Sequence, residues 1–287
     1  MLRIQNEFLS ADVSANGAEL IGLREQGGGE LLWDGNPEWW SGRSPLLFPI
    51  VGRVPHNNII VSGERYTVHQ HGFARRSKFD LVSAEAASCQ LRLVASSESR
   101  TQFPFNFELV VNYSIVGQAL TAIATVLNLS NQPMPVSFGF HPALRWPLPC
   151  GGSRERHFIE FETSEPNPIR KLRDGLLIPE TFETPIVERF LILSDALFEE
   201  GAIVMDKLRS RSLTYVSPLG KSIHFEFPSM PHLGIWSKPG AGFVCIEPWQ
   251  GYAAEEGFTG ELSEKLGTIM IGPGAARKFS MRITLAL

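Results

Sequence analysis

The sequence predicts an all-β protein built as a large sandwich of antiparallel sheets. Apolar and polar residues alternate with a period of two in many segments, turn residues separate these segments, and helical periodicity is weak. The 26 glycines and 20 prolines are spread along the chain and do not collect in one linker. Because strands follow one another without alternating helices, antiparallel sheets packed face to face are favoured over a parallel α/β fold.

The last strand gives the clearest pattern. In residues 278–285, apolar side chains alternate with mostly polar ones, and Leu287 continues the apolar face, which is typical of a half-buried strand. The same alternation occurs in residues 90–93, 159–162 and 222–227, and longer β-rich runs occupy residues 107–116, 119–129 and 134–146. Short helical turns are expected only at residues 195–200 and 261–266.

Length and composition predict one globular domain over residues 1–287. Large sandwiches exceed about 200 residues as single units, and 43% hydrophobic residues supply a large core. The net charge of −4 argues against a nucleic-acid partner. No run approaches the roughly 18 apolar residues of a membrane span, and Glu7 interrupts the place of a signal-peptide core. We therefore expect a cytoplasmic protein without a membrane partner, whose three cysteines are reduced and structural.

Two residues stand immediately before a proline inside apolar runs, His141 and Glu247. The proline ring excludes the helical region for the preceding residue, so both are expected on extended backbone at or near a strand end. Alternation puts His141 on one face with Ser137 and Gly139, whose small side chains leave room for a ligand. Because histidine exchanges protons near neutral pH and glutamate is a good base, the two form a candidate acid/base pair.

Residues 69–75 combine two histidines, a glycine, an aromatic residue and Arg75, a set that suits a polar ligand. His69 and His71 could share one face of a strand as metal ligands, but a third ligand at suitable spacing is missing, so we expect no metal. Residues 44–53 are an apolar run ending in Arg53, which fits a buried strand with a solvated arginine. Nucleophile, phosphate-loop and dinucleotide motifs are also missing, which points to proton transfer without a cofactor.

Trp249 lies two residues after Glu247, and Trp236 lies upstream. Most tryptophans belong to a core. A tryptophan beside a candidate catalytic carboxylate also suits stacking on the apolar face of a sugar, so both interpretations of Trp249 stay open.

Three motifs occur in the order and approximate spacing of the aldose 1-epimerases, the galactose mutarotase-like proteins. They are His-Gly-Phe-Ala-Arg at residues 71–75, Gly-Phe-His-Pro at 139–142 and Ile-Glu-Pro-Trp at 246–249. The chain resembles this family over nearly its whole length, and residues 47–52 make it most similar to the LacX-like and hexose-6-phosphate mutarotase branches. The resemblance implies a large antiparallel β-supersandwich (galactose mutarotase-like) and cofactor-free interconversion of the α and β anomers of an aldose.

The resemblance also implies roles for individual residues. His141 would protonate the ring oxygen, and Glu247 would remove the proton from the C1 hydroxyl. His71 would hydrogen-bond the sugar near the ring oxygen, and Arg75 would hold a hydroxyl or a phosphate, since a guanidinium binds anions in bidentate fashion.

Two departures from the family pattern concern substrate recognition. Galactose mutarotase proper has an Asn-Arg pair shortly after its Gly-Arg, whereas this chain continues from Arg53 with Val-Pro-His-Asn-Asn, so Arg53 is the candidate for part of that sugar-binding role. The family also presents an acidic residue to sugar hydroxyls from the region that here spans residues 195–206. Its position falls on Gly201, so no residue is assigned.

Two other functions stay open. A non-catalytic carbohydrate-binding or sugar-sensing protein would keep the sandwich and its cleft, although a pure binder needs no matched acid and base. A glycoside-cleaving enzyme normally uses two carboxylates, and only one is well placed here. The sequence does not decide which sugar is the small-molecule partner, whether phosphate is required, or whether the protein is a monomer or a homodimer.

Overall fold

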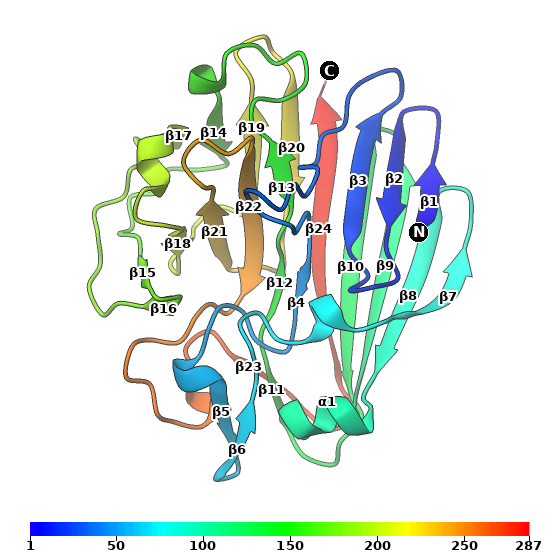
Figure 1. Ribbon diagram of the computed structural model, residues 1–287, viewed down its shortest axis with the longest axis vertical. Coiled ribbons are helices and arrows are strands. Elements are labelled where there is room, and N and C mark those ends of the chain that lie inside the picture. Colours follow the sequence, from blue (N-terminus) through cyan, green and yellow to red (C-terminus); the bar gives the residue numbers. More distant parts are fainter. Residues whose placement is uncertain (287) are drawn as a thin grey trace.

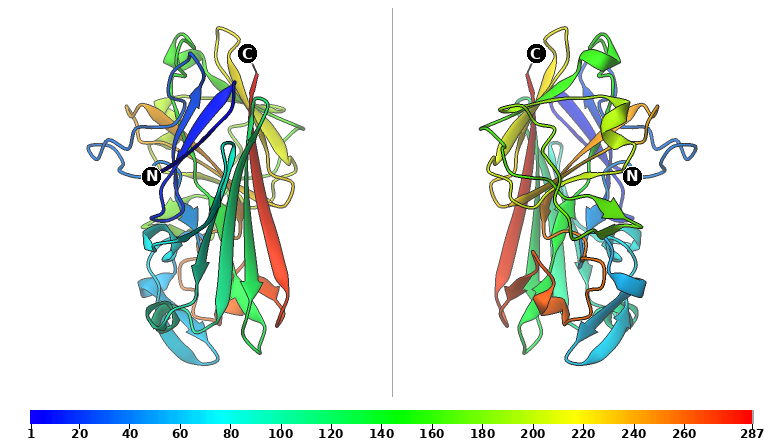
Figure 2. Two further views of the ribbon diagram at one scale, coloured as in Figure 1. Left: turned by 90° about the vertical axis from the view of Figure 1, so that its right-hand side faces the viewer. Right: turned by 90° about the vertical axis from the view of Figure 1, so that its left-hand side faces the viewer.

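The computed structural model describes residues 1–286 and has the all-β, antiparallel architecture that the sequence predicts (Figure 1). Leu287, expected on the apolar face of the last strand, lies outside the described residues. The two largest sheets form two layers that face each other, as the side views show (Figure 2). Every strand pair within these two sheets is antiparallel.

One layer is a nine-stranded sheet. Its strands, in spatial order, are β17 (Phe190–Ile192), β14 (Phe158–Phe161), β19 (Ser212–Val216), β20 (Ser222–Glu226), β24 (Ala276–Ala286), β10 (Ala119–Asn128), β9 (Phe107–Val116), β8 (Ser88–Val94) and β7 (Asp80–Ala84). Alternate residues of β9 are buried and the others are half-buried, apart from its exposed last residue, as the period of two predicts. The buried side chains point toward the second layer and form most of the core.

The second layer is a six-stranded sheet that carries the site. Its strands are β18 (Ile203–Met205), β21 (His232–Trp236), β22 (Phe243–Gln250), β12 (Phe138–Phe140) and β4 (Leu46–Leu47), and β13 (Ala143–Arg145) also pairs with β22. Phe138 of β12 stacks on Phe279 of β24 with ring centroids 4.9 Å apart, so one face of this sheet packs directly on the nine-stranded sheet.

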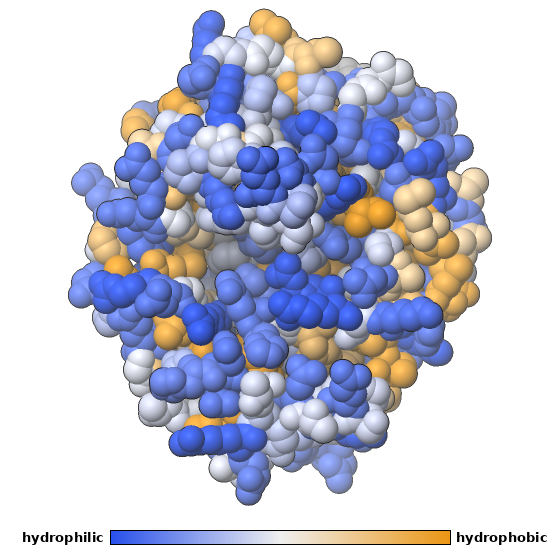
Figure 3. Space-filling view, in the orientation of Figure 1, coloured by the Kyte–Doolittle hydropathy of each residue, from blue (hydrophilic) through white to orange (hydrophobic). Residues whose placement is uncertain are grey.

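Smaller elements complete the molecule. A three-stranded sheet consists of β1 (Leu2–Gln5), β2 (Leu9–Val13) and β3 (Leu20–Glu25). Three strand pairs are β5 (Asn58–Val61) with β6 (Glu64–Thr67), β11 (Met134–Val136) with β23 (Ile269–Ile271), and β15 (Leu172–Arg173) with β16 (Leu176–Leu177). The helical elements are α1 (Ser97–Gln102) and the 3₁₀ turns η1 (Pro55–Asn57), η2 (Ala74–Arg76), η3 (Arg154–Arg156), η4 (Asp195–Phe198) and η5 (Leu262–Glu264). Among the helices of residues 1–286, none combines the length and apolar composition needed to cross a bilayer. The face in Figure 3 is mostly polar.

The structure departs from the sequence predictions at several points, and the 3₁₀ turns η1, η2 and η3 lie outside the two predicted turns. The β-rich run at residues 134–146 is divided into three short strands, because its first part, β11, pairs with β23 in a different sheet and Pro142 separates β12 from β13. Helix α1 was not expected, since its six residues lack an apolar face and its Ser96–Ser99 capping box is the one local signal. All three cysteines were expected to be structural, but only Cys89 and Cys245 are buried, whereas Cys150 is exposed.

Candidate active site

A cavity of about 400 Å³ opens over the six-stranded sheet. Alternation along β22 sends Val244 and Ile246 into the core and turns Glu247 and Trp249 toward the cavity. The cavity therefore lies on the face of the sheet opposite the nine-stranded layer. Its lining consists of Trp40, Gly52, Gln70, His71, Arg75, His141, Leu172, Gly175, Gly201, Ala202, Val204, Trp236, Glu247, Trp249 and Ala253.

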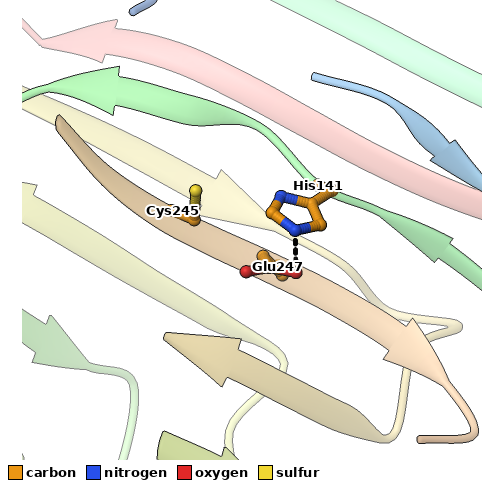
Figure 4. A group of neighbouring side chains, drawn as sticks. All are labelled: His141, Cys245 and Glu247. Carbon is orange, nitrogen blue, oxygen red and sulfur yellow. Dashed lines mark ion pairs between the residues drawn. The ribbon is translucent and has the colours of Figure 1, made fainter. Parts of the chain in front are cut away.

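Strand register places His141 directly opposite Glu247. Gly139 of β12 pairs with Trp249, and Ala143 of β13 pairs with Cys245, so both short strands share one register against β22. Counting two residues on from Gly139 along one strand and two residues back from Trp249 along β22 places His141 opposite Glu247. Directly opposed residues in an antiparallel pair point to the same face. His141 Nε2 lies 3.1 Å from Glu247 Oε2, which Figure 4 shows as a dashed line.

The two prolines act differently in the two strands. Pro142 lies in the gap between β12 and β13, so His141 stands at a strand end as the sequence predicts. Pro248 lies inside β22, which continues to Gln250, so the expected strand end at Glu247 is wrong. A proline is unusual in a strand that is paired on both sides, because it removes a ladder donor. Glu247 therefore projects from a rigid central strand and not from a loop.

Burial pushes the pKa values of the pair in opposite directions. Glu247 is 2% exposed and His141 is 6% exposed. Burial raises the pKa of the Glu247 carboxyl well above its ordinary value, while Arg75 and the Trp249 indole act in the opposite direction. Burial lowers the pKa of His141 well below its ordinary value, and His71 and Arg75 add to this shift. Both effects favour the uncharged forms and leave one proton that the two groups can exchange.

His71 is held in a left-handed conformation with φ at +65°. Its backbone N–H donates to the Gly52 carbonyl at 2.8 Å, and its own carbonyl accepts from the Phe48 N–H at 3.2 Å. Gly72 is required beside it, because a Cβ there would lie 2.0 Å from the Phe48 carbonyl oxygen. His71 Nδ1 accepts from the Gly52 N–H at 3.1 Å, so in the neutral ring Nε2 carries the proton. Burial, with Arg75 and Arg76 nearby, lowers the pKa of His71 to about 3 and keeps it neutral.

Trp249 forms the floor of the cavity. Its indole lies between Gly139 and Gly234, where a Cβ would approach the ring to 2.6 Å and 2.3 Å respectively. The room that small residues leave beside His141 is therefore filled by this ring. Trp249 Nε1 is buried and makes no well-aligned hydrogen bond within residues 1–286, although its N–H lies near enough to Glu247 to favour the ionised carboxylate. Arg75 lines the same cavity, and its guanidinium makes no ion pair with any described carboxylate.

Cys245 lies on the same face of β22 as Glu247 (Figure 4). One donor atom from each of Cys245, His141 and Glu247 lies within 4.8 Å of the others. Burial raises the pKa of the Cys245 thiol well above its ordinary value, and the nearby Glu247 adds to this effect. Because the thiolate and not the thiol is the nucleophile and the metal ligand, we assign neither role to Cys245.

A family model described as aldose 1-epimerase matches residues 1–263. The chain belongs to the aldose 1-epimerase family. Two LacX proteins of Lactococcus lactis subsp. lactis, one plasmid-encoded and one chromosomal, are each 32% identical to it over 89% of this chain and 90% of their own.

Solved structures of this aldose 1-epimerase family share the fold. A galactose mutarotase related enzyme from Lactobacillus acidophilus is 28% identical, with a TM-score of 0.89 over 99% of this chain and 97% of its own. A galactose mutarotase-like protein from Lactobacillus casei is 26% identical, with a TM-score of 0.92 over the full length of both chains. These similarities confirm the resemblance and the fold that the three motifs indicate.

Arg53 is not among the residues that line the cavity of this epimerase-family protein. Its guanidinium turns outward and donates to the Asp174 carbonyl at 2.9 Å, and its stem packs on Gly175, which does line the cavity. His69 also lies outside, in neighbouring surface grooves. The structure thus brings together His141, Glu247, His71, Arg75 and Trp249, and leaves Arg53 at the rim.

No carboxylate from residues 195–206 enters the cavity. Asp195 pairs with Arg154 at 2.6 Å, Glu200 pairs with Lys171, and Asp206 pairs with Arg170 at 3.4 Å. Gly201 and its neighbour Ala202 line the cavity instead. The position suggested by the family pattern is therefore in the wall, but it offers no side-chain acceptor, and Glu247 is the one carboxylate among the lining residues.

Sequence reasoning missed Trp40 and Gln70, both of which line the cavity. Gln70 is adjacent to a motif residue and could have been found by its position. Trp40 belongs to the loop between β3 and β4, and no local pattern connects it with His141. Only the folded chain shows that its ring stacks on the imidazole with centroids 4.9 Å apart.

Proposed function

We propose that this protein is an aldose 1-epimerase that interconverts the α and β anomers of a hexose or hexose phosphate by acid/base ring opening and closure. The observation that carries the proposal is the buried pair of His141 Nε2 and Glu247 Oε2, 3.1 Å apart in a cavity of about 400 Å³. Such a cavity has the size typical of small-molecule sites. Family membership supports epimerase chemistry without naming the sugar.

The reaction needs two proton transfers and no net proton. His141 Nε2–H donates a proton to the ring oxygen while the Glu247 carboxylate accepts the proton of the C1 hydroxyl. The bond between C1 and the ring oxygen breaks, and C1 becomes an aldehyde. Rotation about the C1–C2 bond presents the other face of the aldehyde, and closure reverses both transfers. Each positioned group contributes about 10²- to 10⁴-fold in rate.

The starting protonation state follows from the burial of the pair. Burial favours the protonated Glu247 carboxyl group and the neutral His141 imidazole, whose Nε2 can accept a further proton. When the sugar binds, the C1 hydroxyl donates a hydrogen bond to the carboxylate, and the charge of Arg75 also favours the ionised form. The proton then moves across 3.1 Å to His141. A pair that holds one proton thus supplies one acid and one base.

The remaining lining residues bind the sugar. His71, kept neutral, donates from Nε2 near the ring oxygen. Arg75 binds a hydroxyl or a phosphate with a guanidinium that has no carboxylate partner in the described chain. Trp249 offers a flat apolar floor for the pyranose. Arg53 acts at the rim, where only a substituent that extends out of the cavity would reach it.

Anomer exchange measured by NMR on free aldoses and aldose 6-phosphates tests the proposal. We expect His141→Asn and Glu247→Gln each to lose at least about 10²-fold of the catalysed exchange rate, because each removes one proton-transfer group. Matched controls are His224→Asn and Glu226→Gln, which change the same residue types on β20 of the other sheet. These controls should retain the wild-type rate.

Three outcomes would contradict the proposal. The first is wild-type exchange in either site variant. The second is equal loss in site and control variants, which would indicate general damage. The third is binding of sugars by the wild-type protein without faster exchange of any of them, which would favour a carbohydrate-binding or sugar-sensing protein.

A further inference from the structure

The His141 imidazole lacks the hydrogen bond at its second ring nitrogen that acid/base histidines ordinarily have. Its Nε2 faces Glu247, and its Nδ1 is buried without a hydrogen-bond partner among residues 1–286. In most catalytic and metal sites the second ring nitrogen donates to a carbonyl or carboxylate, which fixes the plane and tautomer of the ring. The orientation of His141 must therefore come from packing.

Trp40 provides the most extensive of these packing contacts. Its indole stacks on the imidazole with ring centroids 4.9 Å apart and an interplanar angle of 26°. His71 and Trp236 meet the same imidazole edge-on, at 5.6 Å and 6.2 Å. A stacked face resists tilting of the imidazole and shields it from water. It also leaves Nε2 free to face Glu247.

The indole of Trp40 is itself held in place. Trp33 Nε1–H donates to the Trp40 carbonyl at 2.8 Å. The ring packs edge-on against Trp236 at 5.5 Å and lies tilted against Phe243 at 5.7 Å. Trp33 and Phe243 are buried parts of one cluster on the six-stranded sheet. The loop between β3 and β4 projects from the body of the molecule (Figure 2), but Trp40 within it is partly buried against the aromatic cluster of the six-stranded sheet.

We propose that Trp40 is a positioning residue, whose indole holds the His141 imidazole with Nε2 directed at the ring oxygen of the bound sugar. This inference rests on the proposed epimerase function. Trp40 also lines the cavity, so the competing role is a sugar platform that touches substrate only. The two roles differ in kinetics. A platform contributes to KM, whereas a positioning residue contributes to kcat.

Three variants separate these roles in the anomer-exchange assay. We expect Trp40→Ala to lose about 10²-fold in kcat with little change in KM, because small misplacement of a reacting group has this effect. Trp40→Phe retains a stacking face and should stay within about tenfold of wild type. Trp39→Ala is the matched control, since Trp39 is its neighbour on the loop, is likewise partly buried against the cluster and approaches Gly240 instead of His141. It should retain the wild-type kcat.

NMR titration of the His141 imidazole gives a readout that needs no activity. The charged or titratable groups around it are Glu247 and Cys245 on β22 and His71 and Arg75 in the adjacent segment, and all variants retain them. Trp40→Ala opens the ring to water and should move its midpoint upward, toward the ordinary 6.5, since burial is the main cause of the lowering. Trp39→Ala should leave the midpoint unchanged.

The outcomes are distinct. Loss of kcat and a moved midpoint in Trp40→Ala, with both retained in Trp39→Ala, would establish positioning. A rise in KM alone with an unmoved midpoint would show a sugar platform and overturn the inference, as would equal effects of the two alanine variants. If the wild-type protein accelerated no sugar and the midpoint still moved only in Trp40→Ala, the epimerase proposal would fail while the packing role of Trp40 stood.

Discussion

Two carboxyl groups in different sheets are almost equally buried, but they differ in their hydrogen-bond partners and in the direction of their pKa shifts. Asp12 of the three-stranded sheet is 3% exposed and Glu247 of the six-stranded sheet is 2% exposed. Asp12 accepts hydrogen bonds from Arg3 at 2.7 and 2.9 Å and from Arg24 at 2.6 Å, and these partners lower its pKa to about 2. Glu247 Oε2 lies 3.1 Å from His141 Nε2 but makes no well-aligned hydrogen bond within residues 1–286, and burial raises the pKa of its carboxyl group.

The difference teaches that partners, not burial, decide what a buried carboxyl group does. Two guanidinium groups keep Asp12 ionised down to about pH 2, so at neutral pH its role is to stabilise the fold. Glu247 is buried beside one imidazole, and neither Arg75 nor the Trp249 indole offsets the effect of burial on its pKa, so its proton can leave and return. A polar atom left unsatisfied in a core lowers stability, which is the usual cost of a functional site.

Removing the charge of Asp12 should give the largest change in stability. We expect Asp12→Asn to lower the free energy of unfolding by about 2 kcal/mol, since a pKa lowered from 3.8 to about 2 corresponds to this amount. The arginines remain partly exposed and regain water, which limits the loss. Urea unfolding at neutral pH measures the change. The anomer-exchange rate should stay at the wild-type level, and a loss of activity without unfolding would break the contrast with Glu247.

The same carboxylate predicts how acid weakens the protein. Because the pKa of Asp12 is lowered on folding, its contribution is fully present above about pH 4 and is lost as the pH falls through about 2. Wild type and Asp12→Asn should therefore converge in stability toward pH 2. Thermal unfolding of both proteins across pH 2–6 checks this expectation. A constant difference over the whole range would mean that Asp12 acts by shape and not by charge.

Removing the ionisable group of Glu247 should change the free energy of unfolding in the opposite direction to Asp12→Asn, and by a smaller amount. A carboxyl group whose pKa is raised on folding costs stability as the pH rises above its unfolded value of 4.5. We expect the free energy of unfolding of Glu247→Gln to be about 1 kcal/mol higher than that of wild type at pH 7, because active sites are often built at the expense of stability. The gain should disappear below about pH 4. Destabilisation at pH 7 would show that the Glu247 charge is satisfied after all.

The sequence predicts the fold through period and turns. Residues 107–116 and 119–129 were expected as strands and form β9 and β10, which ends one residue earlier, because ten-residue alternation is a strong signal. Prediction from local sequence pattern fails where the pairing of strands in the folded protein overrides that pattern. Pro248 would ordinarily end a strand, yet β22 continues through it, because pairing with β12 and β21 holds the backbone on both sides.

The site was predictable to the extent that each residue sits in a motif. His141 and Glu247 were identified from their prolines and the family pattern, and the structure places them side by side. Arg53 was a candidate for part of the sugar-binding role, and it lies at the rim, where its guanidinium binds the Asp174 carbonyl from a distant segment. The stacking of Trp40 on His141 joins residues a hundred positions apart, and no sequence pattern records such a contact.

The common register of β12 and β13 against β22 has a consequence for how such a site can vary. Because successive side chains of a strand point to opposite faces, a change of one residue in the spacing between Gly139 and His141 would turn the imidazole toward the core even though the histidine itself was kept. Loops around the cavity can change in length without moving His141 away from Glu247. The spacing of these few strand residues is therefore under far tighter geometric constraint than the length of those loops.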